Sequence, residues 1–219
     1  MKIQVCLLLL YTFLLTSFLP AQEQDTEYWE FITWDAWKSQ KFRYYVIQET
    51  RFENNMSDYS RFRLSLNLAY RTRCNLDLEA HLTVIYAKPI DARHFISYPR
   101  LELEFNPYIA FDNGTLVTFR NRLELEHRPN IKYVFFVFRH RSMVSFPLKN
   151  CGKLVGINIY DEFFYHFDSD QVTQNRFYPL EMAFALNEKV NLNLFVMIRE
   201  VLRNNEWHRS FVLGSNLWF

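Results

Sequence analysis

The sequence predicts an all-β fold: an antiparallel, up-and-down transmembrane β-barrel of about 10–12 strands, preceded by an N-terminal signal peptide. Three observations predict it: the order of residues at the N-terminus, long runs in which apolar and polar residues alternate, and a chain that ends in Phe219. Of the 219 residues, 49% are hydrophobic and 22% are charged, which excludes gross disorder. The formal net charge is only +1, so we expect no nucleic-acid partner.

The N-terminal segment has the order of a secretory signal peptide. Lys2 is the only charged residue before Glu23, and an apolar run from residue 3 to residue 19 is followed by Pro20-Ala21 and a polar, acidic stretch. A basic start, an apolar run and a small residue are typical of a signal that is cleaved on export. An uncleaved membrane anchor is the alternative, because the apolar run approaches spanning length. We expect a signal peptide over residues 1–21 and a single outer-membrane barrel domain over residues 22–219.

The rest of the chain alternates with a period of two. In residues 60–70, for example, Arg61 and Arg63 have one parity, whereas Phe62, Leu64 and Leu66 have the other. Alternation over ten or more residues predicts strands, because successive side chains of a strand point to opposite faces. Eleven such runs are present, at about 28–37, 41–53, 59–71, 75–86, 95–106, 115–127, 132–146, 154–166, 174–186, 190–202 and 208–219.

The length of these runs favours a membrane barrel. Strands of soluble proteins usually have about five or six residues, whereas a tilted strand that crosses a bilayer needs about 9–11. The expected connections are short at 38–40, 72–74 and 187–189 and longer at 87–94, 167–173 and 203–207, a pattern typical of outer-membrane barrels. Aromatic residues at the ends of runs fit the girdles of such barrels: Tyr28, Trp29, Trp37, Tyr86, Tyr165, Trp207 and Trp218.

The number and the end of the runs lead to two further expectations. Bacterial barrels usually have an even number of strands, so either a strand is uncounted or the 28–37 segment lies inside the barrel or against its rim. Phe219 closes an alternating strand, with Leu217, Leu213 and Phe211 on the same parity. We interpret Phe219 as the signal that the chain presents to the barrel-assembly machinery.

If the apolar parity faces lipid, the polar parity faces the lumen and carries charges of both signs. The candidate lumen-facing charged network is Arg61, Arg63, Glu79, Arg100, Glu102, Glu104, Arg120, Arg122, Glu124, Arg139, Arg141 and Glu162. Charges inside a small barrel must pair or meet water. One interpretation is a structural network of arginine–carboxylate pairs, and the other is a narrow polar pore whose charges select small polar solutes. A wide porin is excluded, because open aqueous channels need about 16–18 strands.

Several short motifs support a family assignment. They are the segment from Trp29 to Trp37, Gln48–Phe52, Phe119–Glu124, Phe138–Arg141, Asp161–Tyr165, Asn175–Phe177 and the final aromatic strand. In these motifs the chain resembles a group of Gram-negative outer-membrane barrels catalogued as domain of unknown function 2490. The resemblance implies a barrel in the outer membrane of a Gram-negative bacterium, reached through the Sec pathway. It implies no catalytic residues, because no activity is established for that family.

Catalytic and metal-binding patterns are weak. The six histidines are scattered and have no metal-ligand spacing, so we expect no metal and no cofactor. We expect no enzyme either, although Ser142 and His140 share a strand face and permit a barrel enzyme that acts on lipid. Cys74 and Cys151 fall in turns of different hairpins, so we do not expect a disulfide between them.

The alternative fold interpretation is a soluble, exported, lipocalin-like barrel. Such a barrel would place the apolar parity inside, around an apolar ligand. For the membrane barrel we expect a monomer whose partners are outer-membrane lipid, the barrel-assembly machinery and a small polar solute. Run length and the terminal Phe219 favour the membrane barrel.

Overall fold

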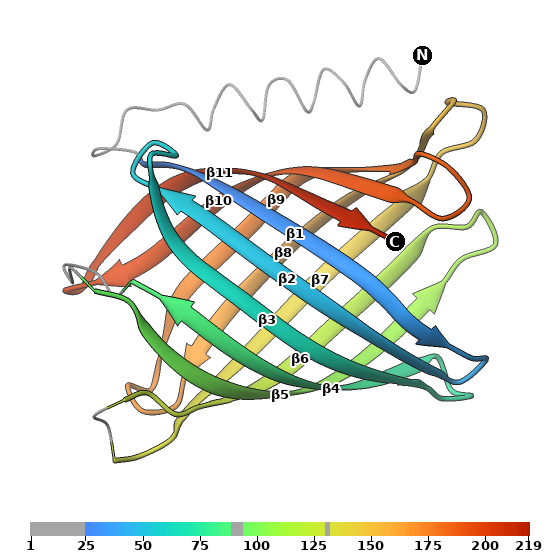
Figure 1. Ribbon diagram of the computed structural model, residues 1–219. Helices are drawn as coiled ribbons and strands as arrows, with labels where there is room; N and C mark the ends of the chain where they lie inside the picture. The colour runs from blue at the N-terminus through green and yellow to red at the C-terminus, as the bar shows by residue number, and fades with distance from the viewer. Residues whose placement is uncertain (1–24, 89–93, 130–131) are drawn as a thin grey trace.

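The computed structural model describes residues 25–88, 94–129 and 132–219, which form a closed barrel of eleven strands (Figure 1). The predicted all-β, up-and-down barrel is thereby confirmed, and the predicted signal peptide lies outside the described residues. The strands are β1 (Asp25–Lys38), β2 (Phe42–Glu53), β3 (Asp58–Arg71), β4 (Leu76–Ala87), β5 (Ile96–Ala110), β6 (Leu116–Glu126), β7 (Phe135–Pro147), β8 (Leu154–His166), β9 (Gln171–Ala185), β10 (Asn191–Arg203) and β11 (Glu206–Trp218). The described segments contain no helix, and hence none with the length and apolarity to cross a membrane.

The barrel closes through a parallel pair of strands. Consecutive strands pair antiparallel, but β1 pairs parallel with β11, from Asp25 opposite Ser210 to Thr33 opposite Trp218. An odd number of up-and-down strands requires this, because the first and the last strand then run in the same direction. The 28–37 segment therefore lies in the barrel wall, and the expectation that it lies inside the barrel or at its rim is wrong.

The two rims of the barrel differ in their connections. Phe219 lies at the rim that carries the turns after β1, β3, β5, β7 and β9, which we call the C-terminal rim, and β1 begins at the opposite rim (Figure 1). The longest connections, after β4 and β6, are at the opposite rim. Two connections expected to be long are short: residues 167–170 join β8 to β9, and Asn204-Asn205 alone join β10 to β11. Both asparagines have positive φ, 51° and 65°, as a two-residue hairpin turn requires.

The apolar parity faces outward and the polar parity faces inward. On β3, Leu64, Leu66 and Leu68 are 41–46% exposed, whereas Ser65 and Asn67 are at most 1% exposed. The lipocalin-like interpretation requires the opposite orientation. The interior is not polar everywhere. Away from β3 it holds a buried apolar cluster, formed by Trp29, Tyr160, Tyr178, Phe195, Met197 and Val212.

Two of the expected girdle tryptophans lie inside the barrel. Trp29 has no exposed surface, and Arg51 lies over its ring at 3.5 Å. Trp218 lines the lumen, with the guanidinium of Arg43 4.3 Å from its ring. A tryptophan near a strand end can face either way, and for these two the parity of β1 and β11 decides.

Candidate functional site in the barrel lumen

A network of arginines and glutamates fills the middle of the barrel. Its members come from most of the wall, from β2 round to β9, because every second residue of each strand points inward. Glu102 has no exposed surface, and Glu49 and Glu162 are 1% exposed. Buried carboxylates of this kind are tolerated only with charged or hydrogen-bonding partners.

Glu102 on β5 is the centre of one half of the network. Its carboxylate lies 2.8 Å from Arg100 Nη2 and 2.6 Å from Arg122 Nη1. Glu124 continues the chain, at 3.0 Å from Arg100 Nη1 and also paired with Arg139. Each of these arginines thus bridges at least two carboxylates, which links the neighbouring strands β5, β6 and β7 along the wall.

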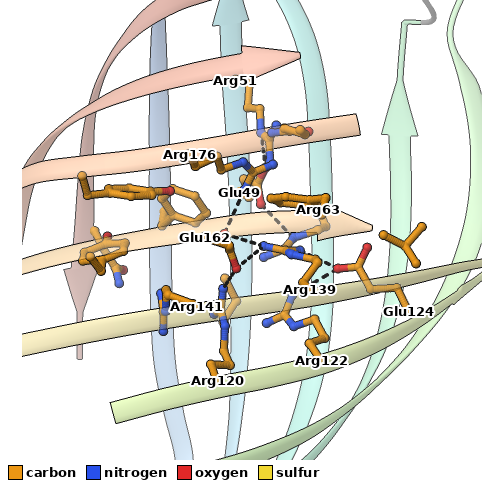
Figure 2. A pocket seen from close by; sticks show the side chains of 18 of the residues that line it. Glu49, Arg51, Arg63, Arg120, Arg122, Glu124, Arg139, Arg141, Glu162 and Arg176 are labelled. Carbon is orange, nitrogen blue, oxygen red and sulfur yellow. Dashed lines mark hydrogen bonds and ion pairs between the residues drawn. The ribbon is translucent and has the colours of Figure 1, made fainter. Parts of the chain in front are cut away.

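Glu162 on β8 is the centre of the other half. Figure 2 shows the guanidinium groups of Arg120, Arg139 and Arg176 directed at its carboxylate. Arg139 donates from Nη2 to both oxygens of Glu162, each at 3.0 Å, and also pairs with Glu124. Arg139 therefore joins the two halves into one network.

A histidine–carboxylate cluster adjoins this network toward the C-terminal rim. His81 lies between two carboxylates, with Nε2 3.1 Å from Glu79 and Nδ1 3.1 Å from Glu102. The possible ligand atoms of Glu79, His81 and Glu104 lie within 4.8 Å of one another, close enough to share one cation. We expected no metal from spacing; these three residues come from β4 and β5, and only the register between the two strands brings them together.

Three neighbouring cavities lie along the lumen. The first, of about 470 Å³, is shown in Figure 2; a second, of about 460 Å³, adjoins it at Arg120, Arg122 and Arg141. A third, of about 560 Å³, reaches the C-terminal rim and shares Arg43 and Glu79 with the second. The network therefore narrows the lumen but leaves space along it.

The first cavity carries an excess of positive charge. Among the described residues, ten arginines and five glutamates line it. No described aspartate or lysine does. Two of the arginines, Arg61 and Arg141, form no ion pair with any described carboxylate. Arg141 instead lies 5.1 Å from the ring of Tyr160. These two guanidinium groups are available to an anion in the cavity.

Comparison with known protein families gives one result. A family described as "Protein of unknown function (DUF2490)" matches residues 26–209. The chain belongs to the DUF2490 family. Neither a curated protein nor a solved structure matches it. The match confirms the resemblance to this family that the sequence motifs indicated. The description of the family names no activity.

The structure places all twelve expected network residues of the DUF2490 barrel on its inner face. Nine of them take part in arginine–glutamate pairs, Glu79 instead contacts His81, and Arg61 and Arg141 are unpaired among the described residues. Sequence reasoning left out Glu27, Glu126, Arg176 and Glu181. Arg176 and Glu181 are both buried although their parity differs, because a bulge at residues 178–179 of β9 lies between them.

Other residues singled out from the sequence lie on or near the C-terminal rim. The backbone of Phe219 pairs with β1: its N–H donates to Thr33 O, and its carbonyl accepts from Asp35 N. Cys74 and Cys151 are exposed, free thiols in the turns after β3 and β7. The strand assignment thus keeps the two cysteines apart, as expected.

Proposed function

We propose that this protein is an integral barrel of the outer membrane of a Gram-negative bacterium, exported through the Sec pathway. The observation that carries the proposal is the outward row of apolar side chains on strands of 11–15 residues. Long strands with an apolar outer face fit a bilayer, whereas a soluble barrel would expose the same surface to water at a cost. Under this proposal the protein is a monomer, lipid covers the outer face, and Phe219 is read by the barrel-assembly machinery.

We further propose that the lumen is a narrow passage for small anionic solutes. The excess of arginine in the first cavity supports this, since rings of Arg or Lys favour anions in pores. The unpaired Arg61 and Arg141 are the lining arginines that would pair with the solute. Eleven strands are fewer than a wide channel requires, which fits a passage limited to small solutes.

A closed, purely structural barrel is the second candidate. The interlocked pairs around Glu102 and Glu162 favour it, because each arginine that bridges two carboxylates also obstructs the lumen. In a closed barrel the network would stabilise the wall without passing solute.

Conductance across a planar bilayer tests the passage and separates the two candidates. Under a salt gradient, the wild-type protein should show a small current with a reversal potential that favours anions. The double variant Arg61→Gln/Arg141→Gln should lose part of this preference, while Arg73→Gln, in an exposed turn away from the cavity, should not. No current from folded protein would contradict the passage and favour the structural barrel.

A further inference from the structure

A polar group interrupts the apolar outer face of the barrel. Arg139 and Arg141 of β7 line the lumen, so His140 and Ser142 point outward. Asn121, at the midpoint of β6, is the direct cross-strand partner of His140, and all three side chains are half-buried. Asp161 of β8 lies opposite Ser142 and is exposed. Polar side chains on a lipid-facing surface are costly, which makes this group a candidate for a function.

Hydrogen bonds connect Asn121, His140 and Ser142 in one chain. The Phe105 carbonyl oxygen can only accept, so the Asn121 amide donates to it from Nδ2 at 3.0 Å and presents Oδ1 to His140. His140 then donates from Nδ1 to Oδ1, at 2.8 Å. In a neutral imidazole with this tautomer, Nε2, 3.0 Å from Ser142 Oγ, carries no proton and accepts from the hydroxyl.

This order is that of a nucleophile, a base and a positioning residue. A serine is activated when a neutral imidazole accepts its hydroxyl proton and a third group fixes the imidazole tautomer. Phe119 and Phe163 hold the His140 ring, with ring centroids 6.2 and 5.5 Å away.

The surroundings point to the substrate. Phe163 also contacts Phe138 of β7, at 6.4 Å, and Tyr165 lies opposite Phe138 in the ladder. These rings extend from His140 toward the rim opposite Phe219. Aromatic girdles lie at the level of the lipid headgroups, next to the ester bonds of the acyl chains. Ser142 itself lies near the middle of β7, and the row of rings connects it with the headgroup level, where the esters of the surrounding lipid are acyl esters.

We propose that Ser142, His140 and Asn121 form a catalytic site on the outer face that hydrolyses acyl esters of membrane lipids. Ser142 Oγ bonds to the ester carbonyl carbon while its proton passes to His140 Nε2. The carbon–oxygen bond to the lipid alcohol then breaks, and the alcohol takes that proton. Water, with His140 again as base, releases the fatty acid and restores Ser142. The inference rests on the proposed membrane location, because the substrate arrives from lipid.

A fluorophosphonate probe tests the nucleophile in detergent, independently of membrane location. Ser142 Oγ should attack phosphorus and expel fluoride, and mass spectrometry of labelled wild-type protein should place the adduct on Ser142. Labelling should be lost in Ser142→Ala and fall in His140→Ala on the order of 10²–10⁴-fold. Ser145→Ala, on the inner face of the same strand, should label as wild type.

Two further readouts test the positioning role and the substrate. Asn121→Asp keeps an acceptor for His140 Nδ1 and should label faster than Asn121→Ala. In mixed micelles of detergent and phosphatidylcholine, wild type should release fatty acid, and Ser142→Ala should not. A difference in mobility between boiled and unboiled samples reports whether each variant is folded.

Three results would overturn the inference. If the folded wild-type protein does not react with the probe, it has no activated serine. If the adduct is found on a residue other than Ser142, then Ser142 is not the nucleophile. Labelling of Ser142 without release of fatty acid would contradict the lipid ester as substrate. Because the probe acts in detergent, a protein found outside the membrane that still labels would contradict the proposed location alone.

Discussion

At the scale of single residues, Glu162 shows how strongly the lumen depends on paired charges. Its carboxylate is 1% exposed and faces Arg120, Arg139 and Arg176. Such a carboxylate offsets the desolvation of several guanidinium groups at once. Removing the charge leaves those groups buried with too few acceptors, which costs more than the pair contributes.

We predict that Glu162→Gln lowers the free energy of unfolding by about 3–5 kcal/mol, because it leaves buried arginines uncompensated. Urea titration of the protein in detergent micelles, followed by the difference in mobility of boiled and unboiled samples, measures this. The control is Glu188→Gln, in an exposed turn, which should change the value by less than about 0.5 kcal/mol. Equal unfolding curves for both variants would show that the network is not stabilising as described.

Gly214 of β11 is required by the ring of Phe195. A Cβ at this position would lie 2.1 Å from Phe195 Cζ, so Gly214→Ala forces the buried ring to move. We predict a loss of about 1–3 kcal/mol in the free energy of unfolding, the usual cost of overpacking. The double variant Gly214→Ala/Phe195→Leu should recover part of this loss in the same urea titration. If the free energy of unfolding does not recover, the strain in Gly214→Ala does not come from contact with Phe195.

At the scale of elements, the alternation of each strand predicts which side chains face the lumen. Arg63, Glu102 and Arg122 could be assigned from parity alone, because a period of two fixes the face once one residue is placed. Arg176 could not, since the bulge at Pro179 reverses the parity within β9. The contact between His81 and Glu102 was equally out of reach, because it depends on the register of β4 against β5.

A substitution on the outer face of β3 distinguishes a barrel that contacts lipid from one that contacts water. Leu66 is 42% exposed near the middle of the strand. In a bilayer, Leu66→Arg should cost about 2–4 kcal/mol and reduce the amount of folded protein in the membrane fraction. Leu66→Ala, which adds no charge, should be recovered in the fraction as wild type is. If Leu66→Arg is recovered in equal amount, the face that carries Leu66 does not contact lipid.

At the scale of the whole molecule, the parallel contact of β1 and β11 makes eleven strands a closed barrel. The count of eleven runs was evident in the sequence, but their closure was not. A preference for even numbers argued against placing the first run in the wall. Alternation describes each strand by itself and says nothing about which strands are neighbours when the chain is closed.

A pair of cysteines tests this closure. Ile32 and Leu217 are register partners across the β1–β11 contact, so Ile32→Cys/Leu217→Cys, with Cys74 and Cys151 replaced by serine, should form a disulfide on mild oxidation. The matched pair Ile32→Cys/Leu213→Cys, four residues out of register, should not. Mobility under reducing and non-reducing conditions distinguishes them. A bridge in the second pair and not in the first would contradict the parallel register.

Electrophoretic mobility tests the proposed membrane barrel most directly. The protein is taken from an isolated outer-membrane fraction and compared with and without boiling. We predict that it is found in this fraction and that the unboiled sample migrates differently, because a barrel closed by hydrogen bonds all round stays folded in detergent. Recovery from the soluble periplasm, with the same mobility before and after boiling, would contradict the membrane barrel.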